Sequence, residues 1–172
     1  MAERIDTSNN RNLLKRETRF GVYGIVLVRW STLPGAIRRN LEPHGRGIYL
    51  EMHVPDPVED NGSSMSLGPF RDGLEMLAEY QVEHMLNYDM FGVTWGNVAI
   101  PARKFLHFDV IEGIKDEDLD RKRLKRINIG FNQTKRALKN RPRGPIYLCV
   151  QSFESLMRNF AKQKPSVESI SG

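Results

Sequence analysis

The sequence of 172 residues contains little cysteine and no long apolar run. Its single cysteine, Cys149, cannot form a disulfide within the chain, so nothing indicates a disulfide-stabilised secreted protein. The most apolar segment, Val22 to Val28, spans about seven residues, whereas a membrane-spanning helix needs roughly 20. The polar first residues lack the apolar stretch of a secretory signal, and Ala2 stands where N-myristoylation requires glycine. We therefore expect a soluble protein, or one that is at most peripheral to a membrane.

Signatures of catalysis and of metal binding are also missing from the sequence. No two of the four histidines have the spacing of a zinc site. They are His44, His53, His84 and His107. Neither a Gly-x-Ser-x-Gly motif nor a phosphate-binding loop is present, and Asp109 and Glu112 are better explained as surface carboxylates than as a catalytic pair. We expect no catalytic residue, metal, cofactor or small-molecule substrate, although an enzyme built from distant residues stays an alternative.

The length and the 40% hydrophobic content predict one folded domain with polar ends. The expected organisation is a mobile N-terminal arm over residues 1–18, a compact domain over 19–162 with a mobile loop at 55–69, and a tail over 163–172. The absence of regular strand–helix alternation favours the α+β class, with helices packed on a mainly antiparallel sheet.

Hydrophobic periodicity places the expected elements along the chain. Strands are predicted at 20–30, covered on both sides, and at 48–54, where alternation predicts a half-buried strand with Tyr49, Glu51 and His53 on the polar face. A tight hairpin is predicted over 91–100 with its turn at Gly96-Asn97. Further strands are expected at 104–112, 127–131 and 146–150, and a turn at 141–145. Helices are predicted at about 33–41, 70–87, 115–126 and 153–160, the last capped near Ser152, and Cys149 is expected to be a small buried hydrophobe.

The distribution of positive charge is the most informative feature of the sequence. Residues 121–143 hold ten of the 26 Lys and Arg residues and no acid, so the remaining 16 bases are outnumbered by 21 acids. Such a concentration predicts a surface that binds polyanions, either nucleic-acid phosphates or anionic lipid headgroups. A solvated helix surface is the alternative explanation for 121–126. The predicted polyanion-binding residues are Arg121, Lys122, Arg123, Lys125, Arg126, Lys135, Arg136, Lys139, Arg141 and Arg143.

The run Arg121-Lys122-Arg123-Leu124-Lys125-Arg126, followed by Ile127-Asn128-Ile129-Gly130-Phe131, resembles the matrix proteins of plant-infecting rhabdoviruses. The likeness extends to the small size, the polar arm, the long loop and the single α+β domain. Unlike many animal members of that family, the sequence has no Pro-Pro-x-Tyr motif. The resemblance implies a non-enzymatic viral structural protein that self-associates, condenses ribonucleoprotein and coats a membrane. It also implies a location in the virion and the host cytoplasm, peripheral to membrane.

Two non-enzymatic functions therefore compete at this point. The first is a matrix-type assembly protein whose partners are itself, the nucleocapsid or RNA, and an anionic lipid surface. The second is a monomeric RNA-binding protein, such as a viral silencing suppressor or a ribonucleoprotein accessory factor. Lys122-Arg123-Leu124-Lys125 also resembles a short nuclear-import signal, which leaves nuclear entry open.

Overall fold

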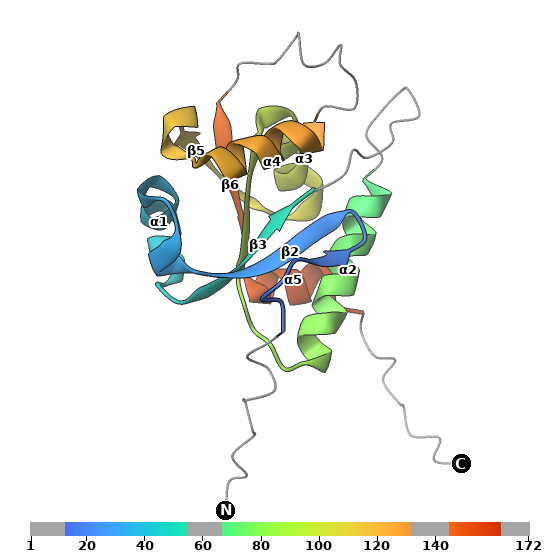
Figure 1. Cartoon of the computed structure of the whole chain (residues 1–172). Coiled ribbons are helices and arrows are strands. Elements are labelled where there is room, and N and C mark those ends of the chain that lie inside the picture. The colour runs from blue at the N-terminus through green and yellow to red at the C-terminus, as the bar shows by residue number, and fades with distance from the viewer. Residues whose placement is uncertain (1–12, 55–66, 132–144, 163–172) are drawn as a thin grey trace, which may run out of the picture.

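The computed structural model describes residues 13–54, 67–131 and 145–162. Within these residues, six strands form one sheet in the order β1-β2-β3-β4-β6-β5 (Figure 1). The strands are β1 (Thr18–Phe20), β2 (Tyr23–Arg29), β3 (Ile48–His53), β4 (Met90–Trp95), β5 (Asp109–Ile114) and β6 (Ile146–Gln151). Neighbouring strands are antiparallel except β3 and β4, which run parallel. The predicted α+β class with a mainly antiparallel sheet is confirmed.

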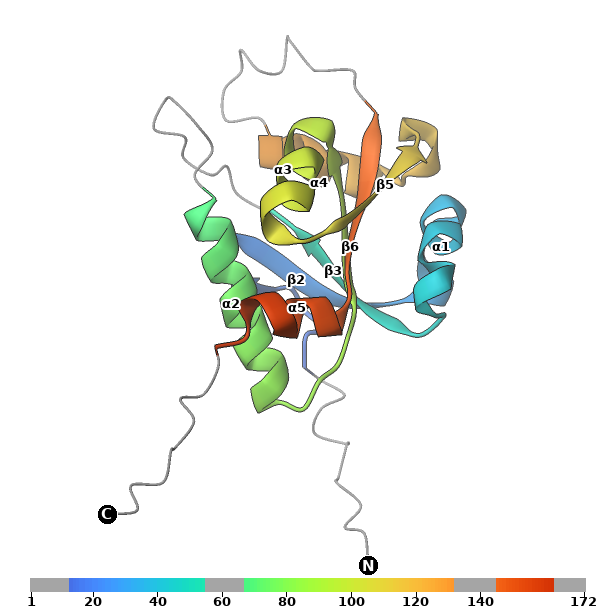
Figure 2. The same ribbon diagram turned by 180° about the vertical axis from the view of Figure 1, so that it is seen from behind.

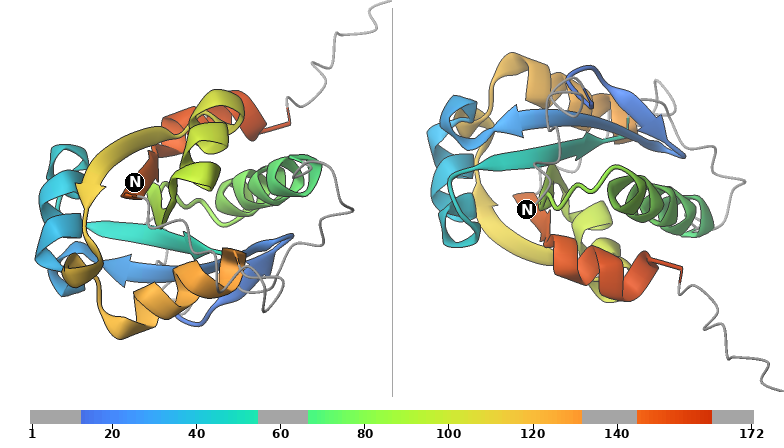
Figure 3. Two further views of the ribbon diagram at one scale, coloured as in Figure 1. Left: turned by 90° about the horizontal axis from the view of Figure 1, so that it is seen from above. Right: turned by 90° about the horizontal axis from the view of Figure 1, so that it is seen from below.

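Helices cover both faces of this sheet. They are α1 (Gly35–Leu41), α2 (Gly68–Glu83), α3 (Gly96–Leu106), α4 (Arg121–Phe131) and α5 (Phe153–Phe160). The helices α2, α3 and α5 lie on one side of the strands, and α4 lies on the other (Figures 2 and 3). The first side holds a core around Leu74, Leu106 and Leu156, and the second holds a core around Ile37 and Ile127, to which α1 and α4 both contribute.

The N-terminal part of the fold is a hairpin rather than one long strand. The strand predicted at 20–30 breaks after Phe20 because Gly21 takes a φ of 59°, a conformation that glycine adopts at little cost. The prediction that both faces of this strand are covered is confirmed for the first half of β2, where Tyr23, Gly24 and Ile25 are all buried. Leu14 is buried in the first core and its carbonyl accepts a hydrogen bond from Leu27, so the folded unit begins before the predicted boundary at residue 19.

Elements with strong local signals are confirmed. The helix predicted at 33–41 exists as α1, with Pro34 directly before its first residue. The predicted 70–87 helix is α2, although it ends at Glu83 and Met85 takes a positive φ, and the strand at 146–150 is β6. The closing helix begins as expected, because the Ser152 hydroxyl accepts a hydrogen bond of 3.1 Å from the Ser155 amide.

The predicted hairpin over 91–100 is wrong. Strand β4 ends at Trp95, and α3 begins at Gly96, where a turn was expected. A Cβ on Gly96 would lie 3.0 Å from the Tyr147 ring, so this glycine permits a close approach between α3 and β6. Helical spacing also buries Ala99, Ala102 and Leu106 together. Since α3 continues to Leu106, the strand predicted at 104–112 begins later, at Asp109.

The strand predicted at 127–131 is also wrong, because α4 runs through these residues to Phe131. Half-buried Leu124 and buried Ile127 pack on the second core three positions apart, which continues the helical period beyond residue 126. Residues 116–118 form a short 3-10 helix before α4 rather than its first turn. Most of the arm at 1–18, the loop at 55–69 and the turn at 141–145, and the tail at 163–172, lie outside the described residues.

Candidate polyanion-binding surface

Five of the ten predicted polyanion-binding residues lie on α4. The other five, Lys135, Arg136, Lys139, Arg141 and Arg143, lie outside the described residues. On α4, Arg121, Lys122 and Lys125 are exposed. Their spacing places them along one side of the helix, away from the side that packs on the sheet. These three residues, called the outward trio below, are the described part of the predicted basic surface that faces solvent.

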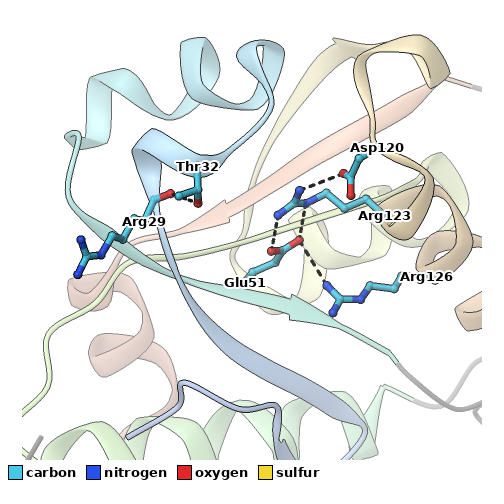
Figure 4. A network of polar contacts seen from close by, with 6 residues as sticks. All are labelled: Arg29, Thr32, Glu51, Asp120, Arg123 and Arg126. Carbon is cyan, nitrogen blue, oxygen red and sulfur yellow. Dashed lines mark hydrogen bonds and ion pairs between the residues drawn. The ribbon is translucent and has the colours of Figure 1, made fainter. Parts of the chain in front are cut away.

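Arg123 points in the opposite direction, toward the sheet. Its Nε lies 2.7 Å from Oε1 of Glu51, and its Nη2 lies 2.8 Å from Oε2 of the same carboxylate (Figure 4). Its Nη1 donates to Asp120 at 3.0 Å. The side chains of Arg123 and Glu51 are 14% and 5% exposed. Arg123 therefore holds α4 on β3 through a bidentate ion pair, the strongest form of the arginine–carboxylate contact.

Arg126 completes this cluster from the next turn of α4. Its Nη1 lies 3.8 Å from Oε1 of Glu51, and its side chain is 22% exposed. Burial alone would lower the pKa of Arg123, but the hydrogen bonds and negative charge of Glu51, and then those of Asp120, raise it. Arg123 thus stays charged and paired. The predicted basic surface is divided: three bases face solvent and two clamp the helix. We call Glu51, Asp120, Arg123 and Arg126 the clamp.

The position of Glu51 corrects a further expectation. Alternation along 48–54 predicted a half-buried strand with Tyr49, Glu51 and His53 on a polar face. In the structure, Tyr49 is buried in the second core and Glu51 is 4% exposed, because α1 and α4 cover that face. A buried carboxylate needs a charged partner, and Arg123 supplies it.

His53 lies two residues beyond Glu51, on the same face of β3. Its Nε2 contacts the Glu17 carboxylate, and its Nδ1 is buried without a hydrogen-bond partner in the described part of the chain. Burial lowers the pKa of His53, the charge of Arg126 lowers it further, and Glu17 and Glu51 oppose these effects. The neutral imidazole is therefore favoured beside the clamp.

Three glutamates lie on the other side of the sheet, on α2. The helix α2 carries Glu75, Glu79 and Glu83, and the last two are exposed together with Met76 and Val82. Since α2 and α4 lie on opposite sides of the sheet, the acidic and basic helices are separated in space (Figure 2). The glutamates of α2 and the outward trio of α4 therefore face away from each other.

A second basic cluster, which was not predicted, surrounds Trp30 at the end of β2. The Cζ atoms of Arg38 and Arg46 lie 5.4 Å and 5.1 Å from the centre of the Trp30 ring. Trp30 Nε1 donates to the Arg38 carbonyl at 3.0 Å. A sequence signal was available, because residues 29–47 contain four arginines, one tryptophan and a single acid, Glu42.

The remaining candidate groups have ordinary surroundings. Asp109 and Glu112 are both exposed, and Cys149 is buried, which raises the pKa of its thiol to about 12. Over residues 13–54, 67–131 and 145–162, no three His, Cys, Asp or Glu side chains come together as a metal site would require. No helix in the same ranges has the length and apolar character to cross a membrane. Comparisons with protein-family models, curated proteins and solved structures gave no match for the chain.

Proposed function

We propose that this protein is a non-enzymatic structural protein of the matrix type, which binds RNA or ribonucleoprotein through α4. One observation carries the proposal: Arg121, Lys122 and Lys125 face solvent from a helix that is fixed by the buried Glu51–Arg123 pair. Because α4 is already fixed on the sheet, its bases bind phosphates without the cost of first ordering the helix. The predicted bases at 135–143 follow α4 in the sequence and lie outside the described residues.

RNA is favoured over lipid by the position of the apolar side chains. Peripheral membrane helices combine bases with apolar residues that enter the bilayer. Among residues whose side chains are described, the exposed large hydrophobic residues lie on β3, α2 and α3 and in the turn after α2, and none lies on α4 between residues 121 and 127. They are Ile48, Met76, Val82, Met85, Ile100 and Phe105. The apolar residues of α4 with described surroundings, Leu124 and Ile127, instead pack on the second core.

Self-association is the second part of the proposal, and the separated charges support it. The acidic outer side of α2 on one copy is complementary to the outward trio on another. Such a contact joins two different surfaces, so it generates chains of molecules rather than a closed dimer. A monomeric RNA-binding protein is the competing function, and it would use α4 without the α2 contact.

The RNA part is tested by charge reversal on the full chain. A variant with Arg121, Lys122 and Lys125 all changed to Glu should lose affinity for a fluorescent single-stranded RNA by on the order of tenfold or more at about 0.1 M salt. The control changes Arg103, Lys104 and Arg158 to Glu, three exposed bases on α3 and α5. Because the control alters net charge equally, it should bind far better than the α4 variant.

Equal losses in the two variants would contradict a defined RNA surface on α4. The same proteins are then mixed with vesicles that contain phosphatidylserine. If the wild-type chain binds these vesicles and not RNA, the assignment to RNA is wrong and anionic lipid takes its place.

Self-association is tested by exchanging charges between helices. Light scattering across a concentration series should show smaller particles for a variant with Glu75, Glu79 and Glu83 changed to Lys. The α4 reversal should shrink them too, and mixing the two variants should restore growth, because each then supplies the surface that the other lacks. A wild-type chain that stays monomeric across the series would favour the competing function.

A further inference from the structure

We propose that Trp30, Arg38 and Arg46 form a second RNA contact, which receives one nucleotide of a single strand. The two guanidinium groups would bind its phosphate and the indole would contact its base. The inference rests on the proposed RNA function but concerns a different site, on α1 and the turns that flank it. It adds base contact to a surface that otherwise recognises only charge.

The indole is held in a fixed position. Trp30 begins a short 3-10 turn at the end of β2, and its backbone amide donates to the Gly47 carbonyl at 2.9 Å. Its Nε1 is satisfied by the Arg38 carbonyl. The ring is half-buried against the second core, so part of its surface stays accessible. A pre-positioned aromatic ring is what a stacking contact requires, since little freedom is lost on binding.

The two arginines have unused donor capacity. The Nε of Arg38 is buried and has no hydrogen-bond partner in the described residues. Arg46 pairs with Glu42, but both side chains are well exposed, at 66% and 44%. An exposed pair of this kind contributes little free energy, so a phosphate can replace the carboxylate. Arg46 can therefore turn to an anionic ligand at the cost of its contacts with Glu42 and the Trp30 ring, whereas Arg38 supplies a buried Nε without a partner in the described residues.

The surroundings of Trp30 favour an anion that carries an aromatic group. Arg29 and Arg39 are exposed nearby in the sequence, and the guanidinium of Arg29 points away from the clamp (Figure 4). Single-stranded nucleic-acid sites combine a positive groove with aromatic rings in this way. A site for phosphate alone has no use for the ring.

The experiment uses the intrinsic fluorescence of the full chain. The chain has two tryptophans, and Trp95 is buried at 9% exposure, so a Trp95→Phe variant leaves Trp30 as the reporter. This variant is titrated with a short oligouridylate and, in parallel, with inorganic polyphosphate, which has charge but no bases. We expect oligouridylate to quench Trp30 fluorescence and polyphosphate to bind without comparable quenching. Equal quenching by both, or none by bound oligouridylate, would overturn base contact.

Two substitutions then separate the base from the phosphate. Trp30→Leu should weaken oligouridylate binding on the order of tenfold and leave polyphosphate binding nearly unchanged. Arg46→Gln, at an exposed position, should weaken both ligands and serves if Trp30→Leu fails to fold. The matched control is Arg158→Gln on α5, which should weaken neither ligand to the same degree.

The outcomes distinguish this site from the proposed function. If the wild-type chain binds no RNA, the proposed function fails and this inference fails with it. If RNA binds and depends on the outward trio, but Trp30→Leu and Arg46→Gln have no effect beyond that of the control, only the second contact is refuted.

Discussion

Replacing Glu51 with glutamine should destabilise the protein far more than the loss of one surface charge. Glu51 lies on β3, its side chain is 5% exposed, and both of its oxygens accept hydrogen bonds from Arg123. The substitution preserves size and shape but removes the negative charge. Arg123 would then be left largely buried with only the exposed Asp120 as a partner, and Arg126 would lose its nearest carboxylate.

The size of the effect follows from this geometry. Removing one partner of a buried ion pair costs about 3–5 kcal/mol, because the other charge is left uncompensated. Arg123 keeps Asp120 and is 14% exposed, so the lower end of that range applies, about 3 kcal/mol. For a chain of this size, such a loss lowers the melting temperature by roughly 6–12 °C.

Urea unfolding followed by circular dichroism measures this difference, with thermal melts as a second readout. Glu42→Gln is the matched control, because Glu42 pairs with Arg46 on the surface and should cost at most about 1 kcal/mol. Changing Glu51 and Arg123 together to methionine should recover part of the loss, since Arg123 is then no longer a buried charge and only Arg126, at 22% exposure, loses its carboxylate. If Glu51→Gln and Glu42→Gln have equal effects, the clamp does not hold α4 on the sheet.

Two further predictions concern pH and close packing. The pKa of His53 is lowered in the folded state, so folding favours the neutral ring, and stability should fall as the pH drops through the ordinary value of 6.5 toward the lower folded value. Urea midpoints between about pH 7.5 and pH 5.5 measure this slope, which His53→Gln should flatten; an unchanged slope would exclude His53 as its source. Gly73→Ala should destabilise despite the helix preference of alanine, because its Cβ would lie 2.6 Å from the Phe20 carbonyl oxygen, whereas Gly47→Ala meets nothing within 4 Å. Thermal melts that rank these two variants in the opposite order would contradict the described packing of α2 on the hairpin.

Local signals in the sequence were enough to predict several elements of the fold. Ser152 begins α5 through a contact only three residues away, and the apolar period of α1 is complete within seven residues. The turn predicted at Gly96-Asn97 is wrong because glycine is needed at residue 96 for close packing against Tyr147 on another strand. Glycine is favoured both in a tight turn and where two elements approach closely, and only the tertiary structure distinguishes these two cases.

The candidate site was predicted only in part, because tertiary contacts decide which of its bases face solvent. The charge run identified α4, but Arg123 turns inward because of Glu51, which is 72 residues away in the sequence. Alternation along β3 suggested that Glu51 faces solvent, as most glutamates do. The Trp30 cluster was not predicted because its bases are spread over residues 29–47 and do not form one continuous basic segment. Such a cluster becomes visible when the fold brings Arg38 and Arg46 to one ring.

The most direct test of the account compares the salt dependence of RNA binding for two α4 variants. Each phosphate contact to single-stranded RNA contributes about 0.7 to the slope of log affinity against log salt concentration. Changing the outward trio, Arg121, Lys122 and Lys125, to glutamine should reduce that slope by about 2. Arg123→Gln should lower stability and leave the slope nearly unchanged under conditions in which the variant is folded. A slope that falls with Arg123→Gln and not with the outward trio would contradict the division of α4 into an RNA-facing side and a clamped side.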